Sequence, residues 1–456
     1  MPVGRPSWAA HRHTCLRWVG ERWLVGGVGT EQDVRRRVEA VWRIESPRVV
    51  AALAHVTRDV GLAEDFAQDA LVAAMEQWPV DGVPDNPGAW LLAVGRRRTI
   101  DWFRRQEALA RKEVELGRVL ALSLASGEMS GVADFEAVEE DIEDDLLRLV
   151  FTTCHPVLAP EARVALTLRL LGGLTTAEIA RAYLVPEATV AQRIVRAKKK
   201  LTSAGAGFST PLPSEFAERL DSVLEVVYLV FNEGYSATAG SDWLRPELCH
   251  DALRLGRVLT GLLPKESEVW ALLALMEIQS SRSGARVGRD GEPVLLLEQD
   301  RGRWDWAAVG RGLAALEKAE SLTDSLGVYW LQAAIAACHA RARTAEQTDW
   351  QRIADLYGAL VVVTRSPVVE LNRAVALSMS AGPEAGLAVL EGVAETPSLE
   401  GYHLVPGVRG DLLERLGRFE EAQEEFQRAA ELTQNEAERR VYLRRAADAA
   451  ALSTGH

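Results

Sequence analysis

Two segments of this 456-residue chain carry dense clusters of arginine and lysine side chains. The first segment, residues 86–105, holds five arginines among three aromatic side chains, namely Arg96, Arg97, Arg98, Arg104 and Arg105 with Trp90, Trp102 and Phe103. Cations pair with the phosphates of a nucleic acid, and aromatic rings stack on exposed bases. The pattern predicts nucleic-acid binding. We expect Trp90 in the core, whereas Trp102 suits either the core or a stacking role.

The second segment, residues 174–201, predicts a helix-turn-helix. Thr175 and Glu178 have the spacing of a capping box, which begins a helix. Pro186 follows a short break and suits the first turn of the next helix. In that next helix, apolar residues recur on one face, and we expect this face to be buried: Val190, Ile194, Ala197 and Leu201.

Another face of this second helix carries groups that can read DNA bases. In the major groove arginine bonds guanine and glutamine bonds adenine, each worth roughly 1–3 kcal/mol of discrimination. The lysines that follow are placed to hold phosphates. We expect DNA contacts from Thr189, Gln192, Arg193, Arg196, Lys198 and Lys199. The alternative is a solvated basic helix in a bundle.

A third segment, residues 59–78, predicts an amphipathic helix. Its apolar side is expected to face the core through Leu62, Phe66, Ala70 and Ala73. Its polar side carries Glu64, Asp65, Gln68 and Asp69. Taken alone, this polar side is a solvated surface.

Helical periodicity positions these segments and extends along almost the whole chain, so the predicted fold class is all-α. We predict two small helical domains, at residues 34–106 and 146–203, the second being the helix-turn-helix. An acidic linker, residues 107–145, joins them, and a helical repeat-like domain, residues 214–450, follows. Residues 1–30 are interpreted as a disordered arm or an extension from a misplaced start codon.

Composition excludes several classes of protein. The net charge of −13 argues against a protein that coats nucleic acid along its whole surface. No nucleotide loop, nucleophile elbow or paired metal ligands occur, so we expect neither an enzyme nor a cofactor. No apolar run is long enough to cross a membrane. The cysteines are isolated and fit the cytoplasm, although three precede a histidine directly: Cys154, Cys249 and Cys338.

In this order, the motifs resemble those of the sigma-70 family of RNA polymerase sigma factors, specifically its small extracytoplasmic-function (ECF) members. The likeness covers about residues 34–201. It rests on the acidic "AED-x-x-Q-D" helix, the "P-x-x-W-L" basic helix ending "D-x-x-R", the acidic linker and the helix-turn-helix.

The resemblance implies specific partners, which are core RNA polymerase, through its β′ clamp and β subunit, and promoter DNA. Residues Glu64, Asp65, Gln68 and Asp69 would contact the polymerase. The −10 promoter element would be met by Arg96, Arg97, Arg98, Trp102 and Arg105, and the −35 element by the helix after Pro186. Two departures affect these roles, since relatives often have Asn near Arg97 and Ser where Val185 precedes Pro186.

The C-terminal half resembles the extension of a sigma subgroup with tetratricopeptide-like repeats. Residues 416–430 fit such a repeat, and residues 371–390 fit it loosely. Gly382 and Gly417 lie 35 residues apart (417 − 382), close to the repeat period of about 34. Our hypothesis is that this domain regulates the sigma factor in cis or binds a protein partner. The alternative for the whole chain is a helix-turn-helix activator with a repeat-type sensor domain.

Overall fold

The computed structural model describes residues 31–120, 142–183, 185–236, 244–288, 293–323, 325–394 and 396–454. Within these ranges the chain is helical, and its only β contact is an isolated bridge between Val287 and Pro293. The predicted all-α class is confirmed. None of the described helices is long and apolar enough to cross a membrane.

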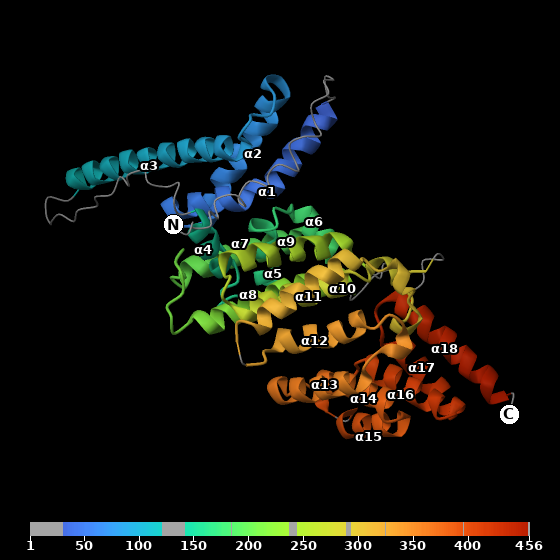
Figure 1. Cartoon of the computed structure of the whole chain (residues 1–456). Helices are drawn as coiled ribbons and strands as arrows, with labels where there is room; N and C mark the ends of the chain where they lie inside the picture. Colours follow the sequence, from blue (N-terminus) through green and yellow to red (C-terminus); the bar gives the residue numbers. More distant parts are fainter. Residues whose placement is uncertain are drawn as a thin grey trace, which may run out of the picture.

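The first three helices form the upper part of the molecule in Figure 1: α1 (Glu31–Thr57), α2 (Val60–Asp81) and α3 (Pro87–Leu120). Asp59 caps α2, because its Oδ1 accepts hydrogen bonds from the backbone N–H of Gly61 at 2.7 Å and of Leu62 at 3.0 Å. As predicted, α3 begins at Pro87.

Helix α3 is longer than the sequence pattern predicted. We expected a linker from residue 107, but the helix continues to Leu120, and Figure 1 shows this end projecting away from the other helices. Residues 106–120 are rich in Ala, Leu, Glu, Lys and Arg, which favour helix even where nothing packs on them. An i,i+4 ion pair between Glu107 and Arg111, at 3.2 Å, adds to this preference.

The next four helices contain the predicted helix-turn-helix: α4 (Ile142–Thr153), α5 (Pro160–Leu170), α6 (Thr176–Ala182) and α7 (Glu187–Ser203). Both hydrogen bonds of the Thr175–Glu178 capping box are present, and Pro186 is the N-cap of α7. The expected stripe is buried at all four positions, Val190, Ile194, Ala197 and Leu201. Helix α4 begins inside the range predicted as linker, of which residues 121–141 lie outside the described part.

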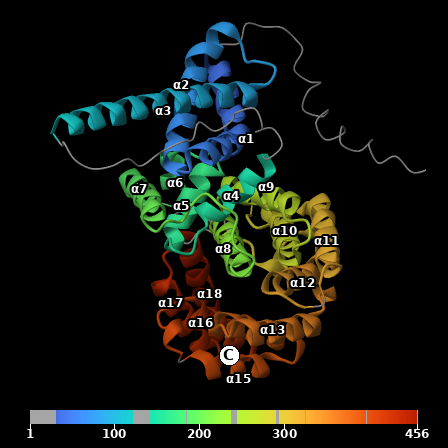
Figure 2. The ribbon, with the colours of Figure 1, turned by 90° about the vertical axis from the view of Figure 1, so that its left-hand side faces the viewer.

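The remaining helices continue from α8 to the end of the chain: α8 (Phe216–Tyr235), α9 (Pro246–Leu262), α10 (Ser267–Ser280), α11 (Trp306–Glu320), α12 (Val328–Arg341), α13 (Trp350–Thr364), α14 (Pro367–Ser380), α15 (Pro383–Ala394), α16 (Leu404–Arg415), α17 (Phe419–Leu432) and α18 (Glu436–Thr454). Figure 2 shows them following a curved path below the first seven helices.

The two glycines of the predicted repeats lie in corresponding turns. Gly382, with φ +102°, ends α14, and Gly417, with φ +75°, ends α16. Both φ values are in the region that favours glycine. Residues 416–430 span this second turn and most of α17, which packs between α16 and α18. The tetratricopeptide assignment stays a prediction.

The largest hydrophobic core passes through all three parts of the chain. It joins residues of α1–α3, of α4–α7 and of α8–α10 without interruption. Smaller cores follow along α10–α14 and among α14–α18. Consequently the first helices of the C-terminal half are packed as part of the same unit as the helix-turn-helix.

Candidate nucleic-acid interface

The basic side of α3 is largely open to solvent. Arg97, Arg98, Arg104 and Arg105 are exposed, whereas Arg96 is half-buried. Trp102 is also half-buried, and its ring meets Phe66 edge-on at 6.3 Å between centroids. It therefore has a core contact, and part of its surface remains accessible. Trp90 is partly buried and packs on Trp78 at 5.4 Å, in line with the core role predicted for it.

The predicted reading face of α7 is exposed at its centre. Gln192, Arg196 and Lys199 are exposed, and Thr189 and Arg193 are half-buried. Arg193 lines a small cavity between α7 and α8. Lys198 differs from these residues because its side chain is only 21% exposed and its Nζ lies 2.5 Å from a carboxylate oxygen of Glu64.

Glu64 lies in the molecule's interior, so the prediction that it belongs to a solvated polar face is wrong. Its side chain is 7% exposed, and its second carboxylate oxygen accepts a hydrogen bond from Nε of Arg169 at 2.6 Å. The polar side of α2 at this point is covered by α5 and α7, which carry the two cations. Helical periodicity describes one helix and could not reveal this packing between domains.

The other members of that acidic group keep more solvent contact. Asp65 and Asp69 are exposed, and Gln68 is half-buried. Partial burial raises the pKa of Asp65, and the nearby Lys198 cation opposes this shift. Three of the four predicted residues are therefore accessible, while Glu64 is not.

Additional polar contacts hold α1 against α4 and α6. Arg43 bonds Glu178 at 2.8 Å, so the capping-box carboxylate also serves as an interdomain partner. His55 contacts the buried Asp145 at 2.8 Å, and Arg148 bonds the same carboxylate at 2.6 Å. Sequence reasoning missed the contacts of Arg43 and His55, since their partners lie 90 or more positions away and share no local pattern with them.

A turn between α5 and α6 brings the two domains into close contact. Gly173 there has φ +69°, and a Cβ at this position would lie 3.1 Å from the Cα of Arg43. Glycine permits both this backbone conformation and this approach. The Gly172-Gly173 pair was the sequence signal that could have indicated a close contact.

The C-terminal half contacts the same helix-turn-helix domain from another side. Arg163 of α5 bonds Glu225 of α8 at 2.9 Å, and Arg219 of α8 donates to the carbonyl of Phe151 at 2.6 Å. Arg254 of α9 donates to the carbonyl of Leu171 at 2.7 Å, in the turn that contacts α1. The C-terminal helices thus reach the interface between the first two domains.

Among the described residues, neither the cysteines nor a cluster of metal ligands indicates a second site. Burial raises the pKa of Cys154, Cys249 and Cys338, which keeps these thiols protonated. In the part of the chain that the structure describes, no group of three or more His, Cys, Asp or Glu residues is arranged to hold a metal ion. The arrangement suits nucleic-acid binding by two basic helices on a helical scaffold.

Comparison with protein families agrees with nucleic-acid binding by these helices. Residues 42–108 match sigma-70 region 2, and residues 148–201 match sigma-70 region 4. Residues 219–320 match a family of unknown function, DUF6596. The matched ranges contain most of α1–α3, then α4–α7, and then α8–α11.

Individual relatives support the same assignment. Uncharacterized protein R00370 of Rhizobium meliloti is 44% identical over 398 residues, which is 87% of this chain and 92% of that protein. The ECF RNA polymerase sigma factor SigK of Mycobacterium ulcerans is 29% identical over 151 residues, covering 32% of this chain and 74% of SigK. The probable ECF sigma factor SigI of Mycobacterium tuberculosis is 26% identical over 167 residues, covering 37% of this chain and 55% of SigI.

The chain thus contains the two regions, 2 and 4, of the sigma-70 family, and its named relatives SigK and the probable sigma factor SigI are ECF members. These matches support a DNA-binding factor of transcription initiation. The sigma-70 family implies core RNA polymerase and promoter DNA as partners, and it points to a protein without catalytic chemistry of its own. The similarity to R00370 extends well beyond the two sigma regions, so that relative shares much of the C-terminal half.

Proposed function

We propose that α3 contacts the −10 promoter element and α7 the −35 element, while the exposed acidic side of α2 binds the β′ clamp of the polymerase. The observation that carries this proposal is the presence of two separate basic faces, on α3 and α7, that stay exposed. The proposed DNA contacts are Arg96, Arg97, Arg98, Trp102 and Arg105 on α3, and Thr189, Gln192, Arg193, Arg196, Lys198 and Lys199 on α7.

Run-off transcription with core polymerase tests these roles. Replacing both Arg97 and Arg98, or both Gln192 and Arg196, by alanine removes contacts worth roughly 1–3 kcal/mol each. We expect transcript yield at limiting protein to fall at least tenfold in either double variant. Arg352→Ala, an exposed arginine on α13, is the matched control. Unchanged transcription by both double variants contradicts the proposal.

The two proposed DNA faces converge on one helix. Lys198 of α7 contacts Glu64 of α2 at 2.5 Å, and Trp102 of α3 contacts Phe66 of α2 at 6.3 Å between ring centroids. By their names, the −10 and −35 elements lie about 25 base pairs apart, or roughly 85 Å along straight DNA. Faces that meet on neighbouring residues of α2 do not span this distance.

We therefore propose that this conformation is a closed, inactive form, which opens when the protein binds polymerase and promoter. In the closed form, Glu64 is withheld from the polymerase and Lys198 from DNA by the same ion pair. Helices α8 and α9 favour this form because they share a core with α4–α7 and contact the turn at Leu171. This is the way in which we propose the C-terminal half regulates the sigma factor in cis.

Arg169 allows a test that leaves every proposed DNA and polymerase contact intact. Removing one partner of a buried ion pair costs about 3–5 kcal/mol. Arg169→Ala should therefore destabilise the closed form, increase the radius of gyration in small-angle scattering and tighten binding to core polymerase. Arg181→Ala, an exposed arginine on α6, is the control. The closed-form proposal fails if the Arg169→Ala protein shows a cooperative melting transition, and so is folded, but has an unchanged radius of gyration and unchanged binding to core polymerase.

A further inference from the structure

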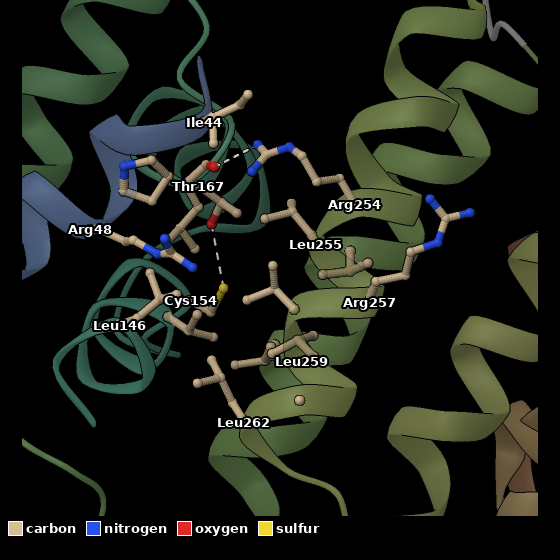
Figure 3. Close-up of a pocket in the computed structure, with 17 residues that line it drawn as sticks. Ile44, Arg48, Leu146, Cys154, Thr167, Arg254, Leu255, Arg257, Leu259 and Leu262 are labelled. Atoms are coloured by element: carbon tan, nitrogen blue, oxygen red, sulfur yellow. Dashed lines mark hydrogen bonds between the residues drawn. The ribbon is translucent and has the colours of Figure 1, made fainter. Parts of the chain in front are cut away.

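A cavity of about 750 Å³ lies where the three parts of the chain meet. Figure 3 shows its walls, which come from α1, from α4 and α5, and from α8 and α9. Its size is within the range of small-molecule sites. Neither the DNA faces nor the acidic side of α2 contributes a residue to it.

Most of the wall is apolar. One side of the cavity is formed by leucines of α9, namely Leu255, Leu259 and Leu262. They face apolar side chains in or next to α4 and α8, namely Leu146, Val150, Cys154 and Val227. The one polar pair on the wall is already satisfied within the protein, since the Cys154 thiol and Thr167 Oγ1 lie 3.4 Å apart. The interior therefore suits a hydrocarbon chain.

Two arginines make the edge of this apolar space cationic. Arg48 of α1 is exposed, no carboxylate partner is recorded for it among the described residues, and Figure 3 shows its side chain extending toward the space between α4 and α9. Arg254 of α9 donates to the Leu171 carbonyl, but its Nε is buried without a hydrogen-bond partner. Arg257 instead turns toward Glu277, which it bonds at 3.1 Å through Nε.

We propose that this cavity binds a small amphipathic anion, an acyl chain with a carboxylate or phosphate head. The tail lies among the leucines of α9 and the side chains of α4, and the head pairs with Arg48 and Arg254. An apolar wall selects the tail, and the guanidinium groups of Arg48 and Arg254 select the negative charge.

Such a ligand would favour the closed form, and this part of the inference rests on the proposed function. The wall that contains Arg48 is formed by α1, whereas the other walls are formed by α4, α5, α8 and α9. Separating α1 from α4 divides the cavity, so a ligand that bridges them binds the closed form better. Only such a difference in affinity shifts a conformational equilibrium.

Calorimetric titration of the full chain tests the binding site directly. The probes are decanoate, decyl phosphate, neutral decanol and the shorter hexanoate. Each methylene removed should weaken binding roughly fourfold, so hexanoate should bind more than a hundredfold more weakly than decanoate. Decanol should bind at least tenfold more weakly than the better of the two ten-carbon anions, and the two anions identify the preferred head group.

Two variants locate the site. Arg48→Ala should weaken the anions at least tenfold and leave decanol unchanged, while Arg352→Ala changes neither. Gly261→Leu adds bulk to a wall position where a Cβ meets no atom within 4 Å, and it should weaken every probe. Absence of binding, which a chain segment occupying the cavity would also cause, overturns the proposal. Equal binding of anions and decanol, or no effect of Arg48→Ala, overturns it as well.

Adding the preferred anion to the polymerase-binding measurement tests the coupling. We expect weaker binding to core polymerase for the wild-type chain and no change for Arg48→Ala. Probe binding without this effect refutes the coupling but leaves the site intact. Failure of the proposed promoter contacts would appear in run-off transcription and would not alter the calorimetric result, so the two failures are distinguishable.

Discussion

The environment of an individual side chain in this protein depends on which domain packs against it. Glu64 belongs to an acidic group that, by sequence, suits a solvated or polymerase-binding surface. In the folded chain it is buried between Arg169 and Lys198. Its neighbour Asp65 remains exposed, one position along the same helix. A helix of 3.6 residues per turn separates adjacent side chains by about 100°, which is enough to place them in different environments.

His339 provides a residue-scale prediction about pH. Burial, with Arg282 and Arg301 nearby, lowers the pKa of His339 to about 3 from its ordinary 6.5. The folded state therefore keeps this ring neutral, while the unfolded state gains a proton below pH 6.5, so its effect is to lower stability as the pH falls. Between pH 7 and pH 5 this effect is about 2 kcal/mol.

Thermal or urea unfolding of the full chain at both pH values measures this loss. His339→Gln should reduce the pH dependence by about that amount, because glutamine does not titrate. His250→Gln, which changes an exposed histidine on α9, should leave it unaltered. Equal pH dependence in all three proteins would contradict the assignment.

Single helices are determined largely by their own residues. The capping box of α6, the buried stripe of α7, and the beginnings of α2 and α3 each lie where the local sequence places them. These features depend on contacts among residues at most a few turns apart. The extension of α3 to Leu120 differs because strong helix formers outweighed the acidic character that suggested a linker.

Two glycine substitutions should have opposite effects on stability. Gly417, with φ +75°, ends α16, and an alanine side chain there is strained, so Gly417→Ala should destabilise the chain by about 1 kcal/mol. Gly310 lies inside α11, where a Cβ meets no atom within 4 Å, so Gly310→Ala should stabilise by about 0.5–1 kcal/mol. Shifts of the same sign in chemical unfolding midpoints would contradict this interpretation of the two glycine positions.

At the scale of the whole molecule, one hydrophobic core extends across the boundaries between the two sigma regions and the C-terminal half. Phe151 of α4 is fully buried and meets Phe216 of α8 at 5.6 Å between ring centroids. Arg163 of α5 is buried against Ser222 and Glu225 of α8. The helix-turn-helix domain consequently has no complete hydrophobic core of its own, because α8 supplies part of it.

Truncation should reveal this dependence. A chain ending at Ser209 loses α8–α18, including the three helices α8–α10 that belong to the large core. This uncovers the side of α4 and α5 that those helices bury, so the fragment should aggregate or lose its cooperative melting transition. A chain ending at residue 395 loses α16–α18 and disrupts the small core that α16 shares with α14 and α15, but it leaves the large core intact and should keep its transition. Size-exclusion chromatography and circular dichroism measure both outcomes. A folded, monomeric 1–209 fragment would contradict the prediction.

The sequence by itself determined the helical class, the helix-turn-helix, the two basic helices and the family resemblance, because each depends on short-range spacing or on motifs read in order. Burial of the predicted stripe at Val190, Ile194, Ala197 and Leu201 followed from helical geometry alone. Only the tertiary structure decided that Glu64 pairs with Arg169 and Lys198, and that α1, α4 and α9 line one cavity. These features join residues distant in the chain, whose proximity depends on how complete helices pack.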